Sequence, residues 1–386
     1  MKKKWIKWLS SLLILLILNG CTQKNYLEKI GLLTAVGYDV AEDDFMEGTL
    51  VVNQFDPQKT DPSKVISAKA YTSKGMRQKL NLEVSNSLVS GQLRVALYGS
   101  ELAEGGISHL VDSLARDASI GNMLYIAITD PPASEILKFQ SEEIQGNMGT
   151  YLYNLIQQNI DLELVSDPTL HTFTTKLLDV GIDPILPIFE IIDGNIGIRS
   201  VAVFHDDHLV GKLPLHDLFY FNLLDTDYRK GSLEIQIEKE KLEKYFTYEQ
   251  REDTTIEEDE MNFYITVNNI STSKDVKLTD TNPSQPKFDL EIDLNVRIIE
   301  MSKAMDLGKP EVIKALSKTI EKKIKKEVER TLKDLQELKT DPVGFGRYYR
   351  AFAKSDLTKE EWRNMYGNSK FNVKVTAEII RTGVID

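Results

Sequence analysis

One long amphipathic segment near the C-terminus constrains the fold more than any other part of the chain. Its apolar residues recur mostly at four-residue steps, and lysines and glutamates fill the other face. Pro310 suits the first turn of a helix. The pattern predicts a helix from about Pro310 to Leu338 with one buried stripe. The residues of that stripe are Val312, Leu316, Ile320, Ile324, Val328, Leu332 and Leu335.

Such a helix buries its stripe either against a partner helix in a coiled coil or against a sheet of its own chain. Steps of four residues drift around the helix, whereas a coiled coil alternates steps of three and four. The flanking sequence also favours the sheet, because residues 287–300 alternate apolar and polar side chains and residues 371–380 read as a closing strand. We expect the helix to lie across an antiparallel sheet.

The first half of the chain alternates strand-like and helix-like segments, which argues for an α/β layer. Strands are predicted at 30–40, 47–55, 92–99 and 123–129, and helices at 74–84, 100–117 and 133–139. Residues 146–181 are helical in pattern, with a division at 166–168. Pro168 is the predicted start of the second helix there.

Pro184, Pro187 and the Asp193-Gly194-Asn195 stretch predict a domain boundary. Beyond it, residues 198–213 read as a hairpin, and the strand-like segments 232–238 and 261–269 flank an acidic run, 251–260, that is typical of a solvated loop. The prediction is a multidomain protein of the α+β or mixed α/β class, with mixed or antiparallel sheets and packed helices. Its expected parts are an N-terminal α/β domain (30–195), a middle α/β domain (196–272) and a C-terminal α/β domain with the long helix (273–386).

The N-terminus has the layout of a secretory signal: four lysines, an apolar run over residues 12–18, and Gly20 before Cys21. The run is too short for a spanning helix, which needs about 20 apolar residues. Leu18-Asn19-Gly20-Cys21 resembles a bacterial lipobox, although Asn19 is unusual there. We expect residues 1–20 to be a signal peptide, Cys21 to be lipidated and residues 21–29 to form a leader. The alternative is that Cys21 is an incidental buried thiol.

Cys21 is the sole cysteine in the sequence, so no intramolecular disulfide forms and stability must come from an ordinary core. The formal charge is −12, and −16 once the four lysines of residues 1–20 are removed. An acidic surface is repelled by phosphate backbones and anionic headgroups. No nucleic-acid partner is expected, and membrane attachment is expected to rest on lipid rather than on a basic surface.

The sequence carries little that predicts chemistry. His205-Asp206-Asp207-His208 has ligand types that suit a metal, but the four residues occupy the expected hairpin tip, where aspartate is favoured by turn geometry. The turn is the preferred interpretation. His109 and His171 stand alone on predicted helices. The common hydrolase, zinc-protease and nucleotide-binding motifs do not occur in the sequence, so no catalytic residue, cofactor or metal is predicted.

Several short motifs, in order along the chain, resemble the Ger(x)C family of spore germination lipoproteins. No one of them is specific alone, but their order and spacing are. They are Ala35–Asp39, Val95–Ile107, Leu114–Asp117, Ala202–Phe204, Leu209–Leu213 and Asp341–Gly346. Two departures stand out: Thr22-Gln23 replaces a Trp-Asp pair usual after the lipidated cysteine, and His205–His208 replaces hairpin tips that are commonly lysine-rich.

The resemblance implies the C subunit of a nutrient germinant receptor, lipid-anchored on the outer face of the spore inner membrane. Its expected partners are the integral membrane A and B subunits, with nutrient recognition usually assigned to the transporter-like B subunit. The resemblance further implies three mixed α/β domains and no known enzymatic role. The leading hypothesis is therefore a non-enzymatic receptor subunit. The alternative is a lipid-anchored solute-binding protein that captures a nutrient itself, and an enzyme is a distant third.

Overall fold

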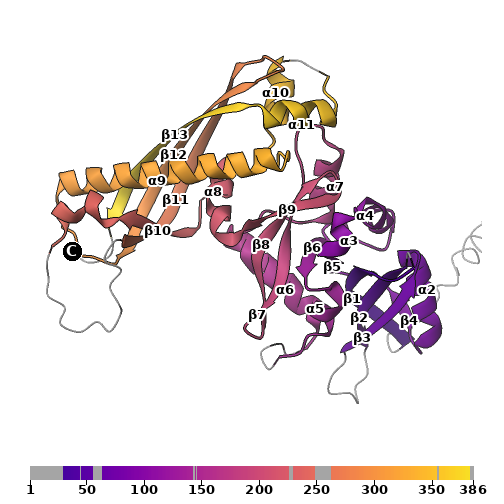
Figure 1. Ribbon diagram of the computed structural model, residues 1–386. Helices are drawn as coiled ribbons and strands as arrows, with labels where there is room; N and C mark the ends of the chain where they lie inside the picture. Colours follow the sequence, from indigo (N-terminus) through magenta and orange to yellow (C-terminus); the bar gives the residue numbers. More distant parts are fainter. Residues whose placement is uncertain are drawn as a thin grey trace, which may run out of the picture.

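The computed structural model describes residues 29–43, 45–54, 63–141, 144, 146–225, 229–247, 262–353 and 356–382. Two β-sheets form the frame, one drawn in indigo to magenta and the other in orange to yellow (Figure 1). Cys21, the predicted signal peptide, most of the leader and the acidic run 251–260 lie outside the described residues.

The first sheet is mixed and has the strand order β3-β2-β1-β5-β6-β7-β8-β9, with β4 beside β1. Strands β1, β5, β6 and β7 run parallel, and antiparallel strands extend both sides. The bounds are β1 (Ile30–Val40), β2 (Met46–Gln54), β3 (Ser63–Ala70), β4 (Ser87–Val89), β5 (Val95–Gly99), β6 (Tyr125–Asp130), β7 (Ile185–Ile192), β8 (Asn195–His205) and β9 (His208–Pro214).

Helices cover both faces of this sheet. One face packs on α5 (Ala133–Lys138) and α6 (Met148–Asp161), and the other on α2 (Ser73–Glu83), α4 (Ser108–Ala115) and α7 (Leu170–Leu178). The expected α/β layer is thus confirmed. Strands buried on both sides read as continuous apolar runs, as in β5, whose five residues are all buried.

Two local predictions for this sheet were wrong, and one strand was missed. Residues 100–117 form two helices, α3 (Ser100–Glu104) and α4, because Gly105-Gly106 ends the first and Gly106 adopts φ +99°. The helix α7 begins at Leu170, since Thr169 rather than Pro168 caps it. Strand β7 was hidden by Pro187, which lies just before Ile188, where pairing with β6 begins.

The second sheet has the order β10-β11-β12-β13, formed by β10 (Ser232–Glu238), β11 (Asn262–Asp280), β12 (Lys287–Met301) and β13 (Lys370–Thr382). The helix α9 (Pro310–Glu337) lies across it with every predicted stripe residue buried, which confirms the strongest prediction. The sheet is not antiparallel throughout, because β13 runs parallel to β12. The connection between them is long, as a parallel crossover requires. It contains α9, α10 (Phe345–Ala353) and α11 (Lys359–Gly367).

The helix α8 (Leu215–Asp225) joins the two sheets and had no sequence prediction. Its residues 217–224 are all buried, so it lacks the polar face that reveals a surface helix. Apolar residues of both sheets meet around it in one continuous core cluster. The predicted boundary at 195 falls at the first residue of β8, which pairs with β7, and the one at 272 falls inside β11. The three-domain division stays a prediction.

Candidate functional site

The charged and buried polar groups concentrate where the two sheets meet. We call this contact the junction. It is formed on the first sheet's side by residues 177–183 and the β8–β9 turn, and on the second sheet's side by residues 340–347 and α11. In Figure 1, α10 and α11 lie at the end of the second sheet that faces α7 and β9.

Asp341 forms the centre of the junction and is 1% exposed. It lies in the Asp341–Gly346 motif, directly after α9. Its carboxylate accepts hydrogen bonds from the backbone N–H groups of Gly344 (2.8 Å) and Gly346 (2.8 Å) and from Nε1 of Trp362 (3.0 Å). Three donors on one buried carboxylate fix the turn that leads from α9 into α10.

A second buried carboxylate, Asp183, reaches the same turn from the first sheet. Its Oδ2 accepts the backbone N–H of Asp341 at 2.8 Å, while its Oδ1 lies 3.4 Å from a guanidinium nitrogen of Arg363. Burial raises the pKa of the Asp341 carboxyl to about 7, against the hydrogen bonds from Gly346 and Gly344, and the neighbouring Asp183 acts in the same direction as burial. The centre of the junction therefore changes charge near neutral pH.

The His205–His208 turn contacts α11 of the second sheet's side and the start of α4 of the first. Oδ1 of Asp206 lies 2.8 Å from Nζ of Lys359, and its Oδ2 lies 2.9 Å from Arg363, both on α11. Asp207 accepts the backbone N–H groups of Ile107 and Ser108 at the start of α4. The predicted turn is confirmed, and its aspartates are occupied by these contacts.

The two histidines of this turn do not form a metal site with its aspartates. Burial and the Arg363 charge lower the pKa of His205, and Nδ1 of His208 lies 2.9 Å from Asp207. No group of three or more His, Cys, Asp or Glu side chains arranged to hold a metal ion occurs within the described ranges. His109 and His171 are exposed on α4 and α7.

Backbone contact between two glycines completes the junction. The Cα of Gly181 is so close to Gly346 that a Cβ built on Gly346 would lie 2.6 Å from it. Nearby, Asp179 lies 2.9 Å from Nε of Arg347 and 3.3 Å from Arg350. Although burial opposes it, the hydrogen bond from Gly181 and the two arginines hold the pKa of Asp179 below its usual value.

A second charged contact ties α8 to α9. Asp217 is buried and pairs with the guanidinium of Arg330, which also bonds Glu327 at 2.8 Å. The hydrogen bond to Asp217 raises the pKa of Arg330, so the guanidinium stays charged. Side chains thus help to join the two sheets both at the junction and at the α8–α9 contact.

A crevice of about 480 Å³ lies at the carboxyl ends of β1, β5 and β6, where open α/β sheets usually bind ligands. Its lining is acidic, with Lys212 paired to Asp130 at 2.5 Å. Asp39 accepts the backbone N–H groups of Ala133 (2.7 Å) and Ser134 (2.8 Å) at the start of α5. The chain's own carboxylate therefore takes the donors that an anionic solute would need, which weakens the solute-binding alternative.

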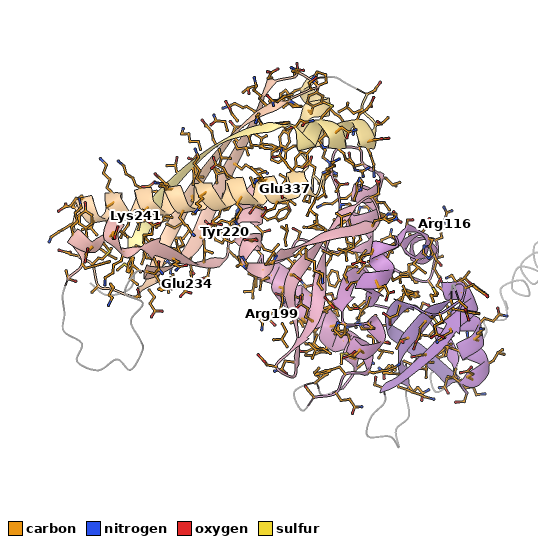
Figure 2. The ribbon with its side chains drawn as sticks, in the orientation of Figure 1. Arg116, Arg199, Tyr220, Glu234, Lys241 and Glu337 are labelled. Atoms are coloured by element: carbon orange, nitrogen blue, oxygen red, sulfur yellow. The ribbon has the colours of Figure 1, made fainter. Side chains whose placement is uncertain are left out.

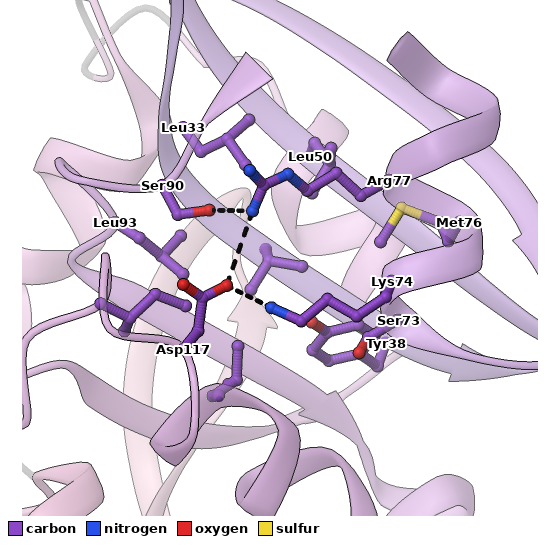
Figure 3. A pocket seen from close by; sticks show the side chains of 13 residues that line it. Leu33, Tyr38, Leu50, Ser73, Lys74, Met76, Arg77, Ser90, Leu93 and Asp117 are labelled. Carbon is purple, nitrogen blue, oxygen red and sulfur yellow. Dashed lines mark hydrogen bonds and ion pairs between the residues drawn. The ribbon is translucent and has the colours of Figure 1, made fainter. Parts of the chain in front are cut away.

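A smaller cavity, of about 30 Å³, lies between α2 and the first sheet (Figure 3). Asp117 closes it by bonding Lys74, with Arg77 3.7 Å away and Arg77 bonding Ser90. Burial opposes ionisation, but hydrogen bonds from Lys74 and Ser119 lower the pKa of Asp117 to about 2. Small-molecule sites are about 300–1,000 Å³, so this cavity suits water alone.

Most of the groups that join the sheets were not singled out from the sequence. Asp179, Asp183 and Arg363 carry no local signal of these contacts, because their partners across the junction lie more than 100 residues away in the sequence. The Asp341–Gly346 motif was noted through the resemblance alone. Its two glycines, one at φ +89° and one against Gly181, were the available signal for a tight turn with close backbone contact.

Comparison with known proteins identifies the class of protein that has this two-sheet architecture. Residues 23–191 match the family model described as "Spore germination protein N-terminal domain", and residues 199–383 match "Spore germination B3/ GerAC like, C-terminal". The protein is of the spore germination class in both halves. The chain belongs to the Ger(x)C family of spore germination proteins.

Individual relatives cover the whole length. The chain is 24% identical over 380 residues to "Spore germination protein GerQC" of Bacillus cereus, covering 98% of this chain and 99% of the other. It is 23% identical over 416 residues to "Putative spore germination protein YfkR" of Bacillus subtilis, covering 100% and 98%. The crystal structure of the GerBC protein has the same fold, with a TM-score of 0.57 at 14% identity over 89% of this chain and 96% of that one.

Proposed function

We propose that this chain is a non-enzymatic subunit of a nutrient germinant receptor, acting in spore germination through contacts with the integral membrane A and B subunits. The observation that carries the proposal is the full-length correspondence to both family models and to GerQC. The structure adds support, because the buried charges of the junction are engaged in joining the sheets and Asp39 occupies the strand-end crevice.

The second part of the proposal is a lipid anchor on Cys21 that holds the protein on the outer face of the spore inner membrane. In the described part of the chain, no helix is long and apolar enough to cross a membrane. A tether raises the effective concentration of the protein beside its membrane partners. Docking then stabilises one state of the receptor if it binds that state more tightly.

The test is a Cys21→Ala variant expressed from its own locus, with Thr22→Ala as a control that keeps the cysteine. The expected result is release of the Cys21→Ala protein from the inner-membrane fraction and slower nutrient germination, with Thr22→Ala retained. Crosslinking in intact spore membranes should join the parent protein to the A or B subunit. Full membrane retention of the Cys21→Ala protein would count against the proposal. Saturable binding of amino acids or sugars to the purified protein, measured by calorimetric titration, would also count against it.

A further inference from the structure

A groove lined by lysines lies between α9 and β10, away from the junction. It has a volume of about 810 Å³. Figure 2 places Lys241 beside the N-terminal part of α9 and Glu337 at the opposite end of that helix. We call it the lysine groove, after the lysines that line it: Lys241, Lys318, Lys322, Lys323 and Lys326.

The concentration of positive charge is unusual for this chain, whose formal charge is −12. Lys241 pairs with Glu238 at 2.5 Å and Lys323 with Glu327 at 3.0 Å. The remaining three lysines, 318, 322 and 326, form no ion pair within 4 Å with any described residue. The hydrogen bond from Lys241 lowers the pKa of Glu238, and the charges of Lys322 and Lys326 act in the same direction. The groove thus presents a net positive surface.

The three lysines without an ion pair form a regular row. They are four residues apart on one helix, so each step advances about 6 Å and the row spans about 12 Å. In an extended chain, alternate side chains share a face and lie about 6.7 Å apart. Three acidic side chains at alternate positions of a strand therefore match the row in spacing as well as in charge.

The other wall of the groove is a free sheet edge. Strand β10 is the first strand of its sheet and pairs with β11 alone. Gln236, Ile237 and Glu238 are consecutive, yet all three line the groove, so the backbone edge of β10 borders it. Among the described residues, the main chain of 232–238 makes no hydrogen bond to a segment other than β11. Such an edge accepts an added strand.

We propose that the lysine groove binds an extended acidic segment of a partner protein, which pairs with the edge of β10 and directs alternate carboxylates at Lys318, Lys322 and Lys326. The side chains on the segment's other face lie beside Glu234 and Glu238, which disfavours acidic residues there. The partner sequence is thus an alternation of acidic and neutral residues. This inference builds on the proposed role as a contact subunit, but it is tested on the isolated protein.

The test uses the full-length chain in nonionic detergent and a fluorescent ten-residue peptide of alternating Glu and Thr. Fluorescence anisotropy should show saturable binding that a Gln-Thr peptide lacks. The Lys318→Glu, Lys322→Glu, Lys326→Glu triple variant should bind at least about tenfold more weakly. The matched control is Lys314→Glu, Lys325→Glu, Lys333→Glu, which changes the net charge equally on lysines that do not line the groove, and it should bind like the parent.

Two further measurements separate strand pairing from simple charge attraction and from lipid binding. A Glu-Thr peptide with alternate backbone N-methyl groups keeps its charges but cannot pair with β10, and it should bind at least about tenfold more weakly. Equal binding of the two peptides would overturn the proposal. Absence of peptide binding would also overturn it. So would a protein that binds phosphatidylglycerol vesicles but not the peptide, if the triple variant, and not the control variant, loses vesicle binding.

Discussion

Asp341 and Asp183 exchange hydrogen bonds across 158 residues of sequence: the N–H of Asp341 donates to Oδ2 of Asp183 at 2.8 Å, and the N–H of Asp183 donates to the carbonyl of Asp341 at 2.9 Å. One residue precedes a strand of the first sheet, and the other follows the long helix of the second. The two bonds satisfy two buried backbone N–H groups, one with a carboxylate oxygen and one with a carbonyl, and they hold the two segments together. The junction is therefore the first place to test the coupling of the two sheets.

Replacing Asp341 by asparagine should lower stability and flatten its pH dependence. Asparagine offers a single acceptor oxygen to the N–H groups of Gly344, Gly346 and Trp362, at a penalty of about 1–3 kcal/mol. The pKa of about 7 in the folded protein lies above the ordinary aspartate pKa of 3.8, so the folded parent binds more protons than the unfolded chain at pH values between the two. This group's contribution is therefore largest below the lower value and declines as the pH rises through the higher one.

Urea unfolding of the parent and of Asp341→Asn at about pH 5 and about pH 8 measures this effect. The free energy of unfolding should differ more between the two proteins at the lower pH. Asp193→Asn is the control, since its side chain is exposed and asparagine tolerates the positive φ of that turn. A parent and an Asp341→Asn variant with parallel pH profiles would contradict the assignment.

Gly181→Ala should separate the two sheets at the junction. A Cβ there would lie 2.4 Å from the backbone nitrogen of Arg347 and 2.6 Å from the carbonyl carbon of Gly346. Overpacking against backbone costs about 1–3 kcal/mol. Gly121→Ala is the matched control, because nothing lies within 4 Å of its Cβ position. Urea midpoints that fall equally for both variants would show that the close approach is not the cause.

Arg330→Ala should destabilise the α8–α9 contact by about 1–3 kcal/mol, since it leaves the buried Asp217 without its guanidinium partner. Lys333→Ala on the same helix removes an exposed pair with Glu337 at 3.5 Å and should change stability by about 0.5 kcal/mol or less. Thermal unfolding followed by circular dichroism compares the two. Equal effects would mean that burial of Asp217 is unimportant.

Asp39→Ala should weaken the start of α5 by about 1–2 kcal/mol, because the N–H groups of Ala133 and Ser134 lose their acceptor. Hydrogen exchange of those two amides should quicken. Glu104→Ala, an exposed change in the same crevice, should leave them unaffected. Unchanged protection in Asp39→Ala would contradict the capping role.

Elements with a strong period were predictable from the sequence, and elements without one were not. The helix α9 has a recognisable apolar stripe because its opposite face is exposed to solvent. Strand β12 alternates apolar and polar residues for the same reason. The helix α8 is buried all round, so it carries no period. Strand β7 contains Pro187, which in most strands would interrupt pairing.

The site was less predictable than the fold because it is assembled from distant segments. The tip aspartates, 206 and 207, were correctly placed in a turn by local geometry, but their bonds to α11 and α4 depend on tertiary packing. The same holds for Asp183. The lysine row was visible as part of the polar face of α9, but nothing in the local pattern indicates that a sheet edge lies beside it.

The length of α9 has a mechanical consequence. Its 28 residues form a rod of about 42 Å, with the lysine groove along its middle and Asp341 just beyond its C-terminal end. A rod of that length swings one end by roughly 4 Å for a tilt of about five degrees, which exceeds the range over which a hydrogen bond holds. The helix α9 therefore links the surface of the lysine groove to the buried bonds of Asp341, and a small tilt of the helix is enough to break those bonds.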